Sequence, residues 1–311
     1  MSHRFLPAVM VMTLVLVSLA SVRVGGQTSR EGFVAAAGTA GGGAQTLPAV
    51  AKPWSPARLP DGQPDVQGVG YWAAKIGADE ADDIEKGSDP IHATIMGRPA
   101  LPSNLISDPP DRTIPYTAAA AAIKNRRLAN RHHPTDVKLR DPIARCLLGG
   151  VPRFQYLSQF QLLQTPGYVV FLYQFEHAFR VVPLDGRPPV ADNIKLWMGD
   201  SRGRWEGNTL VIEVRNHNDL TWFDQAGGYH SDALYVVERL TFVDADTISY
   251  EATFQDPKAY TKPWKIAFPI VRHKETGFEL LEDACFEGVQ GDAALYAPRG
   301  DSPGKTEQKP Q

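Results

Sequence analysis

From about residue 151 onward, the chain alternates between short apolar runs and sequences that favour tight turns. The runs are rich in β-branched and aromatic residues, and Pro-Gly, Asp-Gly, Gly-Asn and Asp-Ala-Asp sequences separate them. This pattern predicts about eight strands at a spacing of roughly ten residues, joined one after another by turns. The expected strands are 160–164, 168–175, 179–184, 205–214 with its Gly-Asn turn, 233–243, 247–255, 263–271 and 277–284.

Such a succession predicts a mainly β fold, either an antiparallel up-and-down barrel or a sandwich. No strand–helix–strand alternation is present, so a Rossmann fold or a TIM barrel is not expected. Hydrophobic residues make up 43% of the chain and charged residues 22%, which is sufficient for a sizeable core. The formal net charge of -3 argues against a nucleic-acid partner, because such proteins usually carry a basic excess.

The first twenty residues have the pattern of a secretory signal peptide. A short positive start precedes an apolar run over 6–19, which is too short for a comfortable membrane span. Ser18 and Ala20 place small residues where a signal peptidase requires them. We therefore expect 1–20 to be a signal peptide, the mature protein to be periplasmic or secreted, and no membrane association after cleavage. The alternative is an uncleaved anchor.

The remaining sequence divides by composition. Residues 21–52 are rich in glycine and alanine, which predicts a flexible linker. Prolines recur from 53 to 116, and proline fixes φ and removes a hydrogen-bond donor. We therefore expect 53–150 to be an irregular arm without long helices or central strands. The barrel or sandwich is expected over 151–290, and the polar residues 291–311 are expected to form a disordered tail.

One short helix is expected within the arm, near 117–130. An alanine run favours helix, and Lys124, Arg126 and Arg127 lie near its C-terminal end, where cations suit the helix dipole. Together with Arg131, these basic residues form either an anion-binding patch or a solvated helix end.

The chain contains two cysteines, Cys146 and Cys285, which lie far apart in the sequence. In an oxidising compartment, an even and well-separated pair predicts one structural disulfide. The alternative is a redox or nucleophilic pair, but no C-x-x-C spacing supports it.

The densest group of chemically versatile side chains lies between the expected strands that end at 214 and begin at 233. His217, Asp219, His230 and Asp232 all fall in this loop. A histidine beside a carboxylate is the usual arrangement for proton transfer near neutral pH, so one histidine would act as base and an aspartate would orient it. The alternative is an ordinary polar loop, because aspartate, asparagine and glycine are common turn formers.

His177 is a second candidate. If strand alternation continued beyond 175, His177 would share a face with the phenylalanines at 175 and 179. In that position it is either a core histidine or an acid–base group that faces a cavity.

Glu238 is a third candidate, because it lies in the middle of an apolar face of the expected strand 233–243. An acid in such a position is costly to bury unless it is paired. Glu238 therefore either pairs with a buried arginine, for which Arg180 and Arg153 are available, or serves as a catalytic acid or base.

No cofactor motif is present. The sequence lacks a phosphate-binding P-loop, a dinucleotide fingerprint and an H-E-x-x-H metal motif. His217 and His230, with Asp219 or Asp232, nevertheless offer nitrogen and oxygen ligands that suit zinc or another divalent ion. A metal site in this loop therefore stays open as an alternative.

Several stretches together resemble a broad family of secreted bacterial proteins of uncharacterised function. The resemblance covers most of 54–288 and implies a secreted protein without implying an activity. Where this family often has tryptophan, the chain has Gly70. The succession of strands is also similar, by analogy, to lipocalin-like barrels. The stretches are RLPDGQPDVQGVG (58–70), CLLGGVPR (146–153), QTPGYVVFLYQFEHAFRVVPLDGRP (164–188), MGDSRGRWEGNTLVIEV (198–214), HSDALYVVERLTFVDADTISYEATFQDPKAYTKPW (230–264) and EDACFEG (282–288).

Three hypotheses of function follow. The first is a β-barrel with a small-molecule cavity that works as a cofactor-independent acid–base enzyme: a lyase, an isomerase, a hydratase or a hydrolase without a serine nucleophile. The second is a non-catalytic carrier or binding protein for a small apolar or aromatic ligand. The third is an interaction protein that uses its proline-rich arm. The sequence leaves the substrate and the oligomeric state open.

Overall fold

A computed structural model of the chain describes residues 54–67, 70–76, 80–95, 97, 99–283 and 285. The chain divides into two units, Met1–Val34 and Ala35–Gln311, and every described residue belongs to the second. The signal peptide expected at 1–20, the linker expected at 21–52 and the tail expected at 291–311 lie outside the described residues.

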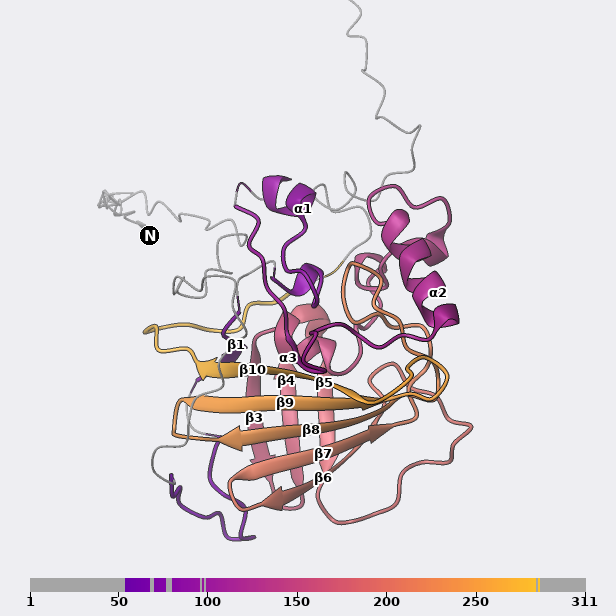
Figure 1. Ribbon diagram of the computed structural model, residues 1–311. Coiled ribbons are helices and arrows are strands. Elements are labelled where there is room, and N and C mark those ends of the chain that lie inside the picture. The colour runs from indigo at the N-terminus through magenta and orange to yellow at the C-terminus, as the bar shows by residue number, and fades with distance from the viewer. Residues whose placement is uncertain are drawn as a thin grey trace, which may run out of the picture. The chain divides into compact units, whose positions relative to one another are not determined.

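The second unit is mainly β. Within its described residues, nine antiparallel strands follow one another in the order β5-β4-β3-β1-β10-β9-β8-β7-β6, and β2 adds to β10 (Figure 1). The sheet curls into a nearly closed barrel, which confirms the predicted fold class. The strands are β1 (Trp72–Ala74), β2 (Ile106–Asp108), β3 (Phe160–Thr165), β4 (Tyr168–Tyr173), β5 (Phe179–Pro183), β6 (Asp200–Glu206), β7 (Thr209–Arg215), β8 (Tyr235–Phe242), β9 (Thr247–Gln255) and β10 (Trp264–Arg272).

Side chains bring together the two ends of this strand order, β5 and β6. The Arg180 Nε of β5 donates a hydrogen bond to the Ser201 Oγ of β6 at 2.9 Å. Gly203 of β6 permits the close approach, because a Cβ at this position would lie only 2.6 Å from the Val182 Cγ1 of β5. In Figure 1, β3, β4 and β5 cross behind the sheet formed by β6 to β10. The barrel is therefore closed at this point by packing and side-chain bonds.

Most of the strands lie where alternation and turn residues predicted them. In β8 the burial alternates strictly, with the even-numbered residues from 236 to 242 facing inward. The turn between β6 and β7 contains Gly207 at φ +63°, a conformation that glycine adopts without steric cost. The core consists of aromatic and aliphatic side chains. The largest of those that are fully buried include Trp72, Trp264, Tyr250, Phe154, Phe160 and Phe171.

Two expectations about the strands were wrong. The arm was not expected to supply a central strand, yet β1 lies between β3 and β10, where Trp72 pairs with both Phe160 and Arg272. The stretch 70–76 contains no proline and is long enough for a three-residue strand. Conversely, no strand forms in the described residues 277–283, where the chain turns at Gly277 and runs over the surface; Ala284 lies outside them.

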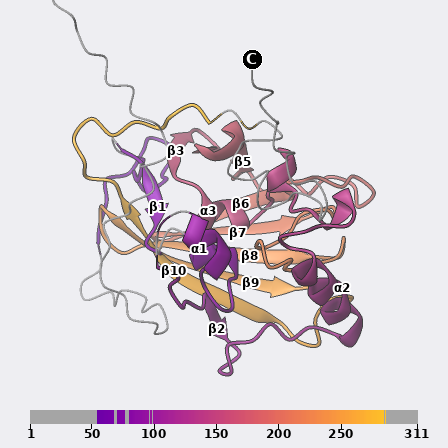
Figure 2. The same ribbon diagram turned by 90° about the horizontal axis from the view of Figure 1, so that it is seen from above.

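Short helices accompany the strands: α1 (Pro90–Ile95), α2 (Ala118–Ala129) and α3 (Arg153–Leu157), with 3-10 turns η1 (Glu80–Asp82), η2 (Val137–Leu139), η3 (Ile143–Arg145) and η4 (Phe175–His177). The predicted helix is α2, which begins after Thr117, whose hydroxyl accepts a hydrogen bond from the Ala120 backbone N–H. Figures 1 and 2 place the three α-helices on one side of the strands. None of the helices in the described ranges has the length and apolar character that a bilayer crossing requires.

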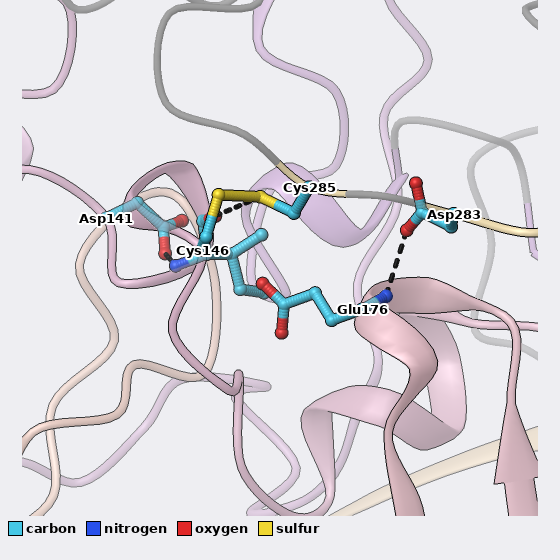
Figure 3. Close-up of a disulfide and its surroundings, with 6 residues drawn as sticks. Asp141, Cys146, Glu176, Asp283 and Cys285 are labelled. Atoms are coloured by element: carbon cyan, nitrogen blue, oxygen red, sulfur yellow. Dashed lines mark hydrogen bonds between the residues drawn. A yellow bond between two sulfur atoms is a disulfide. The ribbon is translucent and has the colours of Figure 1, made fainter.

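Cys146 and Cys285 form the predicted disulfide, with their Cα atoms 5.5 Å apart (Figure 3). Cys146 follows η3, and Cys285 lies in the segment after β10. The bond therefore links the arm to the end of the described chain, across the whole barrel sequence.

Candidate functional site: a buried polar layer inside the barrel

Five strands each contribute one polar side chain to the inside of the barrel. These residues are Tyr173 of β4, Arg180 of β5, Ser201 of β6, Glu238 of β8 and Tyr250 of β9, and each is at most 4% exposed. Strand alternation directs all five inward, since neighbouring residues along a strand point to opposite faces. The result is a polar layer within an otherwise apolar core, which we call the interior layer.

An ion pair forms the centre of the interior layer. The Arg180 Nη2 donates to the Glu238 Oε2, and the Tyr250 hydroxyl donates to the Glu238 Oε1 at 2.8 Å. The Arg180 Nε bonds Ser201 from the other side. Of the two expected fates of Glu238, pairing with a buried arginine is thus the one that the structure shows. The partner is Arg180, because Arg153 is engaged by Asp141 at 2.7 Å.

Two donors of the interior layer are left over. Within the described chain, neither the Arg180 Nη1 nor the Tyr173 hydroxyl makes a hydrogen bond, although both are buried. Burial raises the pKa of Tyr173, and Arg180 opposes that rise through its charge and through a side-chain interaction with the hydroxyl. The Phe171 ring lies 5.7 Å from the Arg180 guanidinium carbon. A buried donor without a partner costs about 1–3 kcal/mol, so these two groups lower stability unless a bound molecule satisfies them.

The two loop histidines come together beside this layer. His217 and His230 have ring centroids 5.9 Å apart, and their exposed fractions are 0% and 1%. The His230 Nδ1 donates to the Ser231 carbonyl at 3.0 Å, so its Nε2 accepts from the Thr221 hydroxyl at 2.6 Å. His217 differs, because neither of its ring nitrogens has a hydrogen-bond partner among the described residues.

Burial keeps both histidines neutral. Removal from water lowers the pKa of His230 to about 4. It also lowers the pKa of His217 well below its ordinary value, and the charges of His230 and Arg180 act in the same direction. The influence of Arg180 on His217 connects the loop histidines electrostatically with the interior layer.

The other predicted site residues lie elsewhere. Asp219 is exposed, and Asp232 pairs with Lys258 at 2.6 Å. In the part of the chain that the structure describes, neither aspartate bonds a histidine. Their role as orienting groups therefore stays a prediction, without a contact to support it.

His177 is exposed and ends the 3-10 turn η4 with φ +49°. The expectation that it shares a strand face with Phe175 and Phe179 was wrong, because β4 stops at Tyr173 and the chain turns before β5. A run of apolar residues concealed this turn in the sequence.

Sequence reasoning missed Glu176, the residue before His177. Its backbone has φ +56°, and within the described chain both of its buried carboxylate oxygens lack a hydrogen bond. Burial raises the pKa of Glu176 to about 8, while the charge of Arg153 opposes the rise. Figure 3 shows Glu176 near the disulfide, with its backbone N–H bonded to Asp283. No local signal distinguishes it, since glutamate at a strand end is ordinary.

The metal site that the sequence left open has no set of ligands among the described residues. Within the described ranges, no three histidine, cysteine, aspartate or glutamate side chains are grouped so that they could hold a metal ion. The comparisons with known proteins add no name: no family model, no curated protein and no solved structure matches the chain. Because these comparisons give no match, the assignment as an antiparallel barrel rests on the strand order of the structure.

Acid should destabilise the protein through His230. The unfolded state has a histidine pKa of 6.5, and the folded state has one of about 4. Between these values the unfolded chain binds a proton that the folded chain rejects, so the free energy of unfolding falls as the pH drops from 6.5 to 4. The whole shift corresponds to about 3 kcal/mol. Urea unfolding at pH 7 and at pH 4.5 measures the loss.

Two matched variants make this test specific. His230→Gln should remove the part of the loss that His230 causes, and the part caused by His217, whose pKa burial also lowers, should remain. His177→Gln, at an exposed histidine, should keep the whole loss. Burial raises the pKa of Glu176 to about 8 and that of Asp224 to about 7. These two acids act in the opposite direction, because the folded state takes up their protons more readily than the unfolded state and gains stability as the pH falls. An identical pH dependence in wild type and His230→Gln would contradict the buried neutral imidazole.

Proposed function

We propose that this protein binds a small molecule inside its barrel, and that the interior layer recognises a hydrogen-bond acceptor of that ligand. The observation that carries the proposal is His217: a fully buried imidazole with neither nitrogen bonded within the described chain. A neutral imidazole always has one N–H to donate. With the Arg180 Nη1 and the Tyr173 hydroxyl, the barrel offers three donors that a ligand carbonyl or carboxylate would satisfy.

The body of such a ligand would be apolar or aromatic. The interior layer is bordered by aromatic rings: Phe171 stacks on Tyr173 at 6.1 Å between centroids, and Phe268 lies 4.8 Å from Tyr250. Barrels of this kind commonly combine apolar walls with a few placed polar groups. The proposed ligand is therefore a small apolar or aromatic molecule with one carbonyl or carboxylate group.

Binding is better supported than acid–base catalysis by the loop histidines. A general base works best when its pKa is near the working pH, and the pKa of His230, about 4, is some three units too low. A shift of that size reduces basicity about a thousandfold. In the described chain, neither histidine has a carboxylate partner that would restore it. The lyase, isomerase, hydratase and hydrolase hypotheses therefore rank below a non-catalytic carrier.

The proposed place of action is the periplasm or the exterior of the cell. Two features support this location: the signal-peptide pattern of 1–20 and a disulfide between the two cysteines.

Tyr173→Phe tests the proposal sharply, because it removes a single hydroxyl that has no partner in the described chain. The variant should be as stable as wild type or more stable, since a buried and unsatisfied polar group disappears. At the same time, its affinity for the ligand should fall by a factor of at least about ten, which corresponds to a loss of about 1.4 kcal/mol in binding free energy, so that less ligand is retained. Native mass spectrometry and metabolite extraction of protein purified without denaturation measure the retained molecule.

Tyr235→Phe is the matched control. Tyr235 lies on the outer face of β8, where its hydroxyl donates to the Glu213 Oε2 at 2.7 Å. Its removal should leave the retained ligand unchanged. Equal ligand retention by wild type, Tyr173→Phe and His217→Leu would exclude the interior layer as the binding site.

A further inference from the structure

The basic residues of α2 and its end do not form one patch. Lys124 lies 3.8 Å from Glu85, and Arg131 lies 2.7 Å from Asp89, so both have acidic partners in the arm. Arg127 is different, because it forms no ion pair within the described residues. Arg126 is exposed to solvent, so Arg127 is the one half-buried and unpaired arginine that remains from the hypothesised patch among the described residues.

Two aromatic rings hold the Arg127 guanidinium. Its central carbon lies 4.6 Å from the Trp222 ring centroid and 5.2 Å from the Tyr229 ring centroid. The Nη1 is buried and makes no hydrogen bond in the described chain. Burial lowers the pKa of Arg127 to about 10, so the group remains charged at neutral pH. Arg127 is thus a half-buried positive charge that has no opposite charge in contact with it among the described residues.

The surrounding loop fixes this arrangement in advance. Gly227 has φ +86°, and a Cβ there would lie 2.4 Å from the Arg127 Cβ, so a glycine allows the loop to close against α2. The Trp222 carbonyl accepts from the Arg153 Nη1 at 3.3 Å, and the Tyr229 N–H donates to the Tyr116 hydroxyl at 3.1 Å. Both rings are therefore anchored by their backbones, which reduces the ordering that a ligand would have to impose.

The charges around Arg127 leave it available to an anion. Asp141 acts on Arg127 from a distance but is held by Arg153 in a two-point ion pair. Asp219 also acts from a distance, and it is exposed to water, which screens its charge. The hydroxyls of Tyr229 and Tyr116 also act on the guanidinium, and the charge of Arg127 in turn helps to lower the pKa of His230.

We propose that Arg127, Trp222 and Tyr229 form a binding site for the carboxylate of a small organic acid. A guanidinium presents its N–H donors in a plane that matches the two oxygens of a carboxylate. The Trp222 ring is buried, so the half-buried Tyr229 ring and the exposed Leu220 provide the apolar surface for an aromatic or aliphatic body. This site uses none of the residues of the interior layer, and it does not rest on the binding function proposed above.

Titration with benzoate tests the site. Wild-type protein should show a saturable change in tryptophan fluorescence and a rise in Tm with benzoate concentration. In Arg127→Met, which keeps an apolar stem between the rings, the benzoate affinity should fall by at least about tenfold. Arg126→Met is the matched control. It removes the same charge from the preceding residue of α2, which is exposed, and should leave the benzoate affinity unchanged.

Further variants keep the test decisive if Arg127→Met does not fold. Arg127→Lys retains the charge without the planar donors and should also weaken benzoate binding severalfold. Asp219→Asn removes an exposed acid whose charge acts on Arg127 and should strengthen benzoate binding. Tyr173→Phe should have no effect, which separates this site from the barrel interior. Benzoate binding that is the same in wild type, Arg127→Met and Arg127→Lys, or inorganic phosphate binding as tightly as benzoate, would overturn the proposal.

Discussion

Replacement of Glu238 by leucine should lower the free energy of unfolding by about 3–5 kcal/mol. The change leaves the Arg180 guanidinium inside the barrel without its counter-charge, at an exposed fraction of 3%. It also removes the acceptor of the Tyr250 hydroxyl. For a domain of this size, a loss of that magnitude lowers Tm by about 6–20 °C. Urea and thermal unfolding of purified protein measure it.

A double replacement separates the destabilisation caused by an unpaired buried charge from the net contribution of the ion pair to stability. Arg180→Met combined with Glu238→Leu should recover most of the loss, because an apolar pair of similar volume avoids an unpaired buried charge. Glu206→Leu is the matched control on the outer face, where Glu206 pairs with Arg239 at 3.0 Å, and it should change stability far less. The buried pair would be refuted as a strong contributor if Glu238→Leu were no worse than Glu206→Leu.

Removal of the disulfide should have an effect of similar size. Cys146 and Cys285 are 139 positions apart, and the bond between them restricts the unfolded chain over that whole length. The chain-entropy model gives roughly 4–5 kcal/mol for such a loop. Cys146→Ser combined with Cys285→Ser should lose that stability in urea unfolding under oxidising conditions.

Two comparisons complete the disulfide test. Wild-type protein unfolded in the presence of a reducing agent should behave like the double variant, since both lack the cross-link. Peptide mass mapping without reductant should show Cys146 linked to Cys285. Two free thiols in oxidised, folded protein would rule out the structural bond.

The hairpin strands could be predicted from the sequence because their information is local. In β8 and β9, alternation of apolar and polar residues marks the buried face, and the acidic turn between them marks where the chain reverses. The same is true of α2, where an alanine run and the Thr117 cap act within one segment. Each of these elements follows from interactions between residues close in sequence.

The unpredicted elements depend on partners far along the chain. A three-residue strand such as β1 has too little pattern of its own and is defined by its pairing with β3 and β10. The turn η4 interrupts what reads as one apolar run, because left-handed backbone at Glu176 and His177 is not encoded by glycine or asparagine.

The candidate site was predictable to the same extent. His217 and His230 share one loop, and their proximity could be expected from the strands that flank it. Glu238 could be recognised as a buried acid by its position in β8. Its partner could not be chosen between Arg180 and Arg153, because that choice depends on how β5 closes against β6. Tyr173 carried no signal at all, since a tyrosine in an apolar strand is ordinary.

The position of β1 places part of the proline-rich arm inside the strand order, between β3 and β10. Without residues 72–74, β3 and the end of β10 over 270–272 would present open edges, with unpaired N–H and carbonyl groups that invite pairing between molecules. Trp72 pairs with both Phe160 and Arg272, so β1 joins parts of the chain that are far apart in the sequence. The sheet on either side is built from local hairpins, whereas the pairing through β1 has a long sequence separation, and contacts of that kind slow folding.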